Sequence, residues 1–208
     1  MIRVKKYWDL KPRNDIPESK IEKIIMRSFP YIKIAVLLIV LEYFLDLGLS
    51  QFAQDSSPRY GVVFLVATVW IHEIGHFTTR MFGNFFMEVL CGTLFQIGTP
   101  LVVAVYLLIR RKLFLASFLI IWVGYNLFDV AQYMSSGESI VGTEMCGFVP
   151  YPSGTTMHDW RTIFNVLGVF TKAEYISSVV YNIAIAVFII GGIVGIYGAL
   201  KVGYDKLD

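Results

Sequence analysis

The chain has 208 residues, of which 56% are hydrophobic and 16% are charged, and its formal net charge is +2 at pH 7. Soluble domains average roughly 45–50% apolar and about 25% charged residues. Because the apolar residues are gathered in long runs, the composition excludes an ordinary soluble domain and indicates an integral membrane protein. We expect a single all-α polytopic helical bundle, with the lipid bilayer as a partner and no nucleic-acid partner.

The N-terminal segment 1–33 is strongly basic, with nine Lys and Arg residues against four acidic residues. It is longer and more polar than the leading region of a cleavable signal peptide. Apolar residues at helical spacing from Ile21 to Met26 indicate an amphipathic helix on the membrane surface, although a solvated basic tail would have the same composition. The positive-inside rule predicts that this segment is cytoplasmic, and that residues 34–208 form one transmembrane domain.

Five apolar segments follow, each near the about 20 residues that a spanning helix needs. They cover residues 34–50, 61–82, 85–109, 113–134 and 175–202. If all five cross the membrane from a cytoplasmic N-terminus, the basic residues 110–112 lie outside, against the positive-inside rule. A broken or re-entrant segment around residues 83–100 would remove this conflict.

The second apolar segment contains the sequence HEIGH at residues 72–76. In a helix, His72 and His76 lie on one face and can bind one metal ion, while Glu73 can reach a water molecule on that ion. Ionisable residues within a span are costly and usually functional. The structural alternative is a set of buried polar side chains that form hydrogen bonds between helices.

A catalytic zinc site usually has three protein ligands and leaves a fourth position to water. The chain has three histidines, and the third, His158, precedes a predicted short amphipathic helix at about residues 157–168. Asp129 is the alternative third ligand, because it shares a polar face of the fourth segment with Asn126 and a carboxylate in a span needs a partner. The spacing alone does not decide whether His158 or Asp129 is the third ligand. It also allows His158 to be an exposed residue at the start of a helix, with no metal bound.

The sequence HEIGHFTTRMFG resembles the metal-binding helix of the site-2-protease class of intramembrane zinc metalloproteases. The ordered set HEIGH, GTLFQIGTP, WVGYNLFDVAQY and HDW is similar, over about residues 61–170, to a largely uncharacterised family of prokaryotic membrane proteins with HExxH and HDW motifs. The resemblance implies a zinc metallopeptidase-like protein of the prokaryotic cytoplasmic membrane. The positions that match are His72, Glu73, His76, Gln96, Asn126, His158 and Asp159.

The resemblance favours His158 over Asp129 as the third ligand. Site-2 proteases take an aspartate ligand from a later span, within an N-x-x-P and D-G pattern, and the sequence NLFD at residues 126–129 lacks both the proline and the D-G pair. We therefore expect zinc on His72, His76 and His158, with Glu73 as the general base for hydrolysis of a peptide bond.

Three further residues complete the predicted site. Asn126 or Gln96 would donate a hydrogen bond to the substrate carbonyl, and Asp159 would orient His158 or cap its helix. The expected substrate is a transmembrane peptide with a Gly or Pro that lets its helix unwind. A zinc hydrolase of a lipid or another amphiphile, a non-catalytic zinc-binding scaffold, and a transporter are the alternatives.

Overall fold

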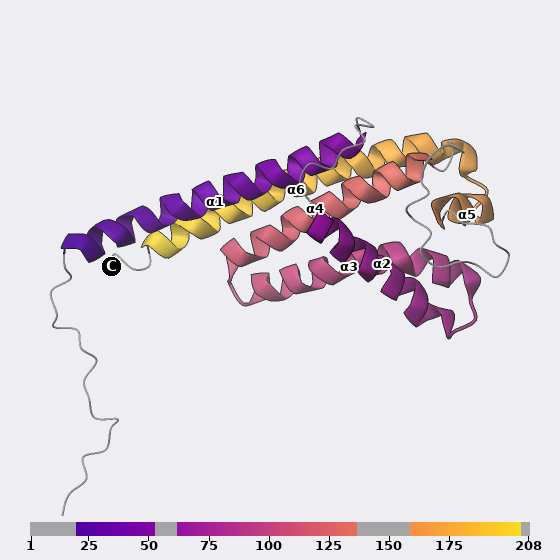
Figure 1. The fold of residues 1–208 in the computed structure, drawn as a ribbon, viewed down its shortest axis with the longest axis horizontal. Coiled ribbons are helices and arrows are strands. Elements are labelled where there is room, and N and C mark those ends of the chain that lie inside the picture. Colours follow the sequence, from indigo (N-terminus) through magenta and orange to yellow (C-terminus); the bar gives the residue numbers. More distant parts are fainter. Residues whose placement is uncertain (1–19, 53–61, 137–158, 205–208) are drawn as a thin grey trace, which may run out of the picture.

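The computed structural model describes residues 20–52, 62–136 and 159–204 of the chain, and these ranges contain helices and no strand. Side chains are described for residues 28–46, 66–135 and 159–201. The elements in chain order are α1 (Lys20–Phe52), α2 (Val62–Arg80), α3 (Phe85–Ile109), α4 (Leu113–Ser136), α5 (Asp159–Val166), the 3-10 helix η2 (Phe170–Lys172) and α6 (Ala173–Tyr204) (Figure 1). The predicted all-α bundle is confirmed.

Four helices of the described ranges are long and apolar enough to cross a membrane. They are Ser28–Asp46 in α1, Phe85–Ile109, Leu113–Ser135 and Phe170–Lys201. These helices confirm the prediction of an integral membrane protein. The helix α2 is not among the four, and the part of it with described side chains begins only at Val66, so the predicted fifth span stays a prediction.

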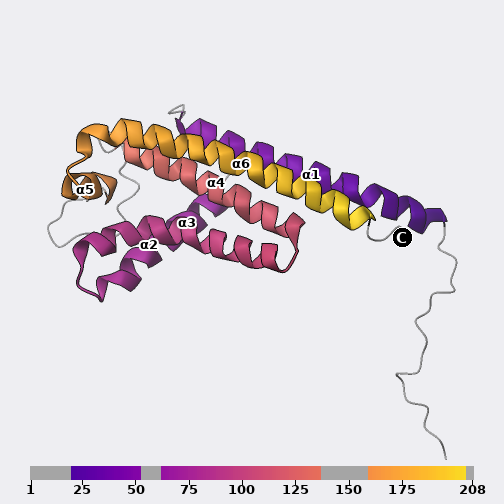
Figure 2. The same cartoon turned by 180° about the vertical axis from the view of Figure 1, so that it is seen from behind.

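The long helices α1, α4 and α6 lie side by side over most of their length (Figures 1 and 2). Their shared core contains Leu37 and Phe44 of α1, Ile121, Tyr125 and Phe128 of α4, and Ala184 and Phe188 of α6. Glycines allow the close approach of α4 and α6, since a Cβ at Gly124 would lie 2.5 Å from the Phe188 ring. This three-helix layer is the scaffold on which the remaining helices are placed.

The helix α3 runs back alongside α4, and both α2 and α5 pack on α3 (Figure 1). α3 therefore lies between α2 and the scaffold. The short helix α5 buries its apolar face, Trp160, Ile163 and Phe164, against α3 and α4. Leu167, which falls within the helix predicted at about residues 157–168, lies beyond the end of α5 and is exposed.

Residues 85–109 form one helix, and Pro100 lies inside it. The break or re-entrant segment that the sequence suggested around residues 83–100 is therefore not found. A proline removes one backbone donor from a helix, so the carbonyl four residues earlier needs another partner. Asn126 supplies that partner, as described below.

Candidate metal centre

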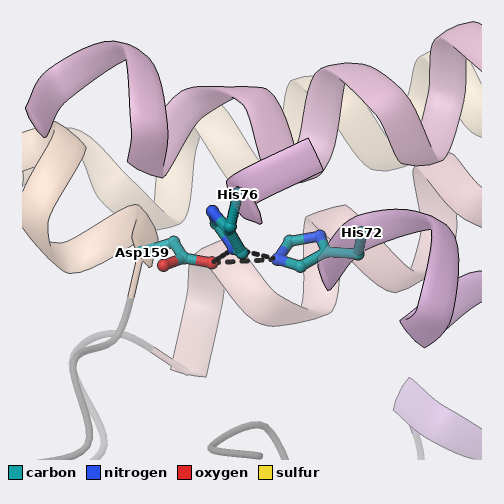
Figure 3. A group of neighbouring side chains, drawn as sticks. All are labelled: His72, His76 and Asp159. Atoms are coloured by element: carbon teal, nitrogen blue, oxygen red, sulfur yellow. Dashed lines mark hydrogen bonds and ion pairs between the residues drawn. The ribbon is translucent and has the colours of Figure 1, made fainter. Parts of the chain in front are cut away.

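Three side chains from two helices meet at the end of the bundle covered by α5 (Figure 3). His72 Nε2 and His76 Nε2 are 2.9 Å apart, and Asp159 Oδ2 lies 3.0 Å from the first and 3.1 Å from the second. Around a tetrahedral zinc ion with bonds of about 2.0–2.1 Å, neighbouring ligand atoms lie about 3.3 Å apart. The three atoms are therefore close to the spacing that one such ion needs.

The other ring nitrogen of His72 is held by an amide whose orientation is fixed. Gln96 Nε2 donates to Asp129 Oδ2 at 2.7 Å, so its Oε1 is the atom that faces His72 Nδ1, at 2.9 Å. An oxygen at this place accepts a hydrogen bond, and Nδ1 must therefore carry the proton. The lone pair of His72 is then on Nε2, which points into the site.

His76 is held in the same tautomer by a different group. Its Nδ1 lies 2.8 Å from the backbone carbonyl oxygen of Glu88, which can only accept. The side chain of Glu88 also accepts from Arg80 Nε at 2.9 Å, which ties the start of α3 to the end of α2. Each histidine thus donates from Nδ1 and presents Nε2 to the site, which is the arrangement of histidines that bind metal ions.

The third group at the site is negatively charged. Burial acts to raise the pKa of Asp159, but hydrogen bonding to His72 and His76 outweighs burial and lowers the pKa to about 2. The backbone N–H of Asp159 donates to the Tyr133 hydroxyl at 3.2 Å, which fixes the start of α5 against α4. Without a metal ion, these hydrogen bonds need a proton on Nε2 of the histidine that donates. When Nε2 of both histidines is deprotonated, two imidazole lone pairs and a carboxylate face one another, and a shared cation would remove their mutual repulsion.

Two glycines allow α2 and α3 to approach closely at the site. A Cβ on Gly75 would overlap the backbone carbonyl of Cys91. A Cβ on Gly92 would lie 2.5 Å from His76 Nε2 and 2.7 Å from His72 Nε2. Any residue larger than glycine at position 92 would therefore occupy the space beside the ligand atoms.

A buried polar network holds α3 in place behind the histidines. Pro100 leaves the carbonyl of Gln96 without its helical donor, and Asn126 Nδ2 donates to that carbonyl at 2.6 Å. Thr68 donates to Asn126 Oδ1 at 3.1 Å, and Trp122 Nε1 donates to Thr68 Oγ1 at 3.4 Å. This network links α2, α3 and α4 next to the metal-binding atoms.

The structure brings together most of the residues that the sequence singled out, but in altered relationships. Asp159 faces both histidines directly, a contact that the sequence did not predict, and its expected role of orienting His158 or capping the helix stays a prediction. His158 lies outside the described residues, and its role as a ligand stays a prediction. Asp129 reaches His72 only through Gln96 and is not one of the three clustered groups.

The side chains of Asn126, Gln96 and Glu73 differ in their burial and in their contacts. Asn126 is fully buried and Gln96 is 3% exposed, and the side-chain amide atoms of both already have partners. The geometry therefore favours a positioning role for both over the predicted contact with a substrate carbonyl. Glu73 is partly buried and interacts electrostatically with His76.

The sequence placed Gly92 at the start of the motif GTLFQIGTP, but predicted no role at the site for Gly75, Gly92, Thr68 or the Glu88 carbonyl. The signals were present for two of them, because Gly75 lies between the two histidines in sequence and Gly92 lies one helical turn before Gln96. Small residues at such positions are typical of closely packed helices in membranes. No sequence pattern indicates which backbone carbonyl a histidine will contact.

Comparison of the chain with family models, with curated proteins and with solved structures gave no match. The class defined here therefore depends on the fold and the side-chain geometry. The protein is an all-α integral membrane protein with a group of two histidines and one aspartate that could hold a metal ion.

Proposed function

We propose that this protein is a membrane-embedded zinc hydrolase that cleaves peptide bonds, with His72, His76 and Asp159 as the zinc ligands. The observation that carries the proposal is the meeting of three electron-pair donors, with His72 and His76 each held by a contact at Nδ1 that leaves Nε2 for a metal ion. Two imidazoles and one carboxylate, with a fourth position for water, are a donor set of zinc hydrolases.

The surroundings of the three ligands suit such chemistry. The side chains of His72, His76 and Asp159 are 12%, 19% and 13% exposed. The site is therefore mostly buried, but all three side chains remain partly accessible to solvent. Zinc, when bound, lowers the pKa of a coordinated water toward about 7 and polarises a carbonyl group. Gln96 and the Glu88 carbonyl hold the two imidazoles, and Asp129 holds Gln96.

Glu73 is the residue that moves the proton in this proposal. It takes a proton from the water as the oxygen adds to the carbonyl carbon, and it returns the proton to the nitrogen when the carbon–nitrogen bond breaks. Its place beside the first histidine of the HEIGH sequence gives it reach to the site without making it a ligand. A non-catalytic scaffold would need no carboxylate there.

The test separates metal binding from hydrolysis. Purified protein is incubated with fluorescein-labelled peptides that each contain one apolar span and a Gly or Pro, and zinc is measured by mass spectrometry. We expect Glu73→Gln to retain zinc and to lose cleavage by at least about a hundredfold. Cleavage that survives in Glu73→Gln would contradict the assignment of the base, and iron in place of zinc would indicate an oxygenase-type site.

A further inference from the structure

We propose that the metal centre opens at the non-cytoplasmic face of the membrane, and that the chain crosses the bilayer four times without a crossing by α2. The orientation of the site is independent of the hydrolysis proposed above. The substrate class drawn from it, the non-cytoplasmic flank of a membrane-anchored polypeptide, depends on that function.

The contacts of α1 and α4 show that these helices run in the same direction. Near the beginning of the candidate span Ser28–Asp46 and near the beginning of α4, Lys33 Nζ lies 5.5 Å from the centre of the Phe114 ring. Further along both helices, the rings of Phe44 and Tyr125 are 5.5 Å apart. Both helices therefore run from one end of the bundle toward the end that holds the metal centre.

The helices α3 and α6 run the opposite way. Ser177, early in α6, donates to the Ala131 carbonyl late in α4 at 2.7 Å. Gly198, late in α6, packs against Phe114 at the start of α4. The turn at residues 110–112 joins the end of α3 to the start of α4, and Figure 1 shows this turn and the ends of α3 and α6 away from α5.

These directions constrain α2. The spanning part of α1 ends on the side of the metal centre, and α3, the next of the four candidate spans, begins on that same side. A crossing by α2 would therefore need a second crossing in the connection between α1 and α2, which has nine residues, fewer than the about 20 that a spanning helix needs. The helix α2 thus enters the membrane region without completing a crossing.

Charge identifies the two sides. The basic side chains Lys33, Arg110, Arg111, Lys112 and Lys201 gather at the end away from the metal centre, with no acidic side chain there among the described residues. Eight more Lys and Arg residues precede Lys33 in the chain. By the positive-inside rule this end is cytoplasmic, and the conflict raised by five spans disappears.

The opposite end is predominantly acidic. It carries Glu73, Glu88, Asp129, Asp159 and Glu174, against Arg80, Arg161 and Lys172 in the described ranges. At 1.5 Å per residue, Asp129 lies about 24 Å along α4 from Leu113, in a hydrocarbon core of about 30 Å. The metal centre therefore lies near the outer boundary, where α5 exposes Asn165 and where water can enter.

The test labels single cysteines with a membrane-impermeant maleimide in intact cells. In a Cys91→Ala, Cys146→Ser background, Asn165→Cys and Thr171→Cys report on the metal-centre end, and both residues are exposed. Arg111→Cys and Ile109→Cys report on the other end, where both residues are exposed, and Ile109→Cys removes no basic residue. We expect labelling of the first pair in intact cells, and of the second pair only after permeabilisation.

The reverse pattern, or equal labelling of both pairs in intact cells, would overturn the proposal. A second measurement probes the site itself in zinc-loaded membranes. The impermeant chelator EDTA should remove zinc from right-side-out vesicles at least about tenfold faster than from inverted vesicles, and the opposite order would contradict the orientation. Cysteine labelling needs neither zinc nor hydrolysis, so a failure of the proposed function would leave the orientation testable.

Discussion

Asn126 Nδ2 donates to the backbone carbonyl of Gln96 at 2.6 Å, at the point where Pro100 deprives that carbonyl of its helical donor. The side chain of the same Gln96 accepts from His72. The Asn126 amide on α4 thus supplies the donor that Pro100 removes from α3, and it holds Gln96, whose side chain orients His72. The proline, the two amides and the histidine form one unit.

A double-mutant cycle tests this repair. Asn126→Leu should lower the free energy of unfolding by about 2 kcal/mol, because the Gln96 carbonyl is then buried without a donor. In a Pro100→Ala background the helix supplies its own donor, so the same change should cost about 1 kcal/mol less. Equilibrium unfolding in detergent measures both. Equal costs in the two backgrounds would show that the proline and the amide are not coupled.

Asp129 can be distinguished as a positioning residue or a metal ligand by two substitutions. Asp129→Asn keeps an oxygen that can accept from Gln96 Nε2, so zinc affinity should change by less than about threefold. Asp129→Leu removes the acceptor, and the affinity should fall about 10–100-fold, as is usual for groups that orient ligands. Competition with a fluorescent zinc chelator gives both constants. A large loss in Asp129→Asn would instead make the carboxylate a ligand.

Gly92 should be irreplaceable at the site for a steric reason. Its added Cβ in Gly92→Ala would lie 2.5 Å from His76 Nε2, so zinc affinity should fall by about tenfold or more. Gly98→Ala is the matched control on the same helix, because a Cβ at Gly98 meets nothing within 4 Å. Zinc titration of both variants gives the comparison. Equal affinities would contradict the close approach of α3 to the histidines.

Zinc should be released as the pH falls, with the imidazole of His76 as a titrating group. Its Nδ1 already donates to the Glu88 carbonyl, so an added proton must go to Nε2, the metal-binding atom. Burial acts to lower the pKa of His76, but the hydrogen bond to Asp159 and the charge of Asp159 outweigh burial and raise this pKa above its usual value. Asp159, with a pKa of about 2, stays charged over this range. Protons therefore compete with the metal ion for Nε2, and apparent zinc affinity should decrease as the pH falls from about 7 to about 5. A flat profile over this range would contradict histidine ligation.

The positions of the helices were largely predictable from the sequence. The segments expected at residues 85–109 and 113–134 match α3 and α4 closely, because long apolar runs bounded by basic or polar turns have few other solutions in a bilayer. The number of crossings was not predictable in the same way. A single apolar run does not reveal whether it crosses the membrane or returns, and that depends on the direction of its neighbours.

The site was predictable where it depended on local spacing. His72 and His76 lie four residues apart on one helix, which places them together without tertiary information. Asp159 lies 83 residues beyond His76, and no spacing rule connects them. The link between Gln96 and Asn126 had a usable signal, since a proline four residues after Gln96 leaves a carbonyl that must find a donor.

The most direct measurement is the zinc content per chain of detergent-purified protein, in the wild type and in His76→Ala, Asp159→Ala and His158→Ala. We predict about one zinc in the wild type and a loss of most of it in His76→Ala and Asp159→Ala. His158→Ala tests whether His158, the third ligand expected from the sequence, binds zinc in place of Asp159. If Asp159 is the ligand, His158→Ala should retain most of its zinc. No zinc in the wild type, or unchanged zinc in Asp159→Ala, would contradict a centre built on His72, His76 and Asp159.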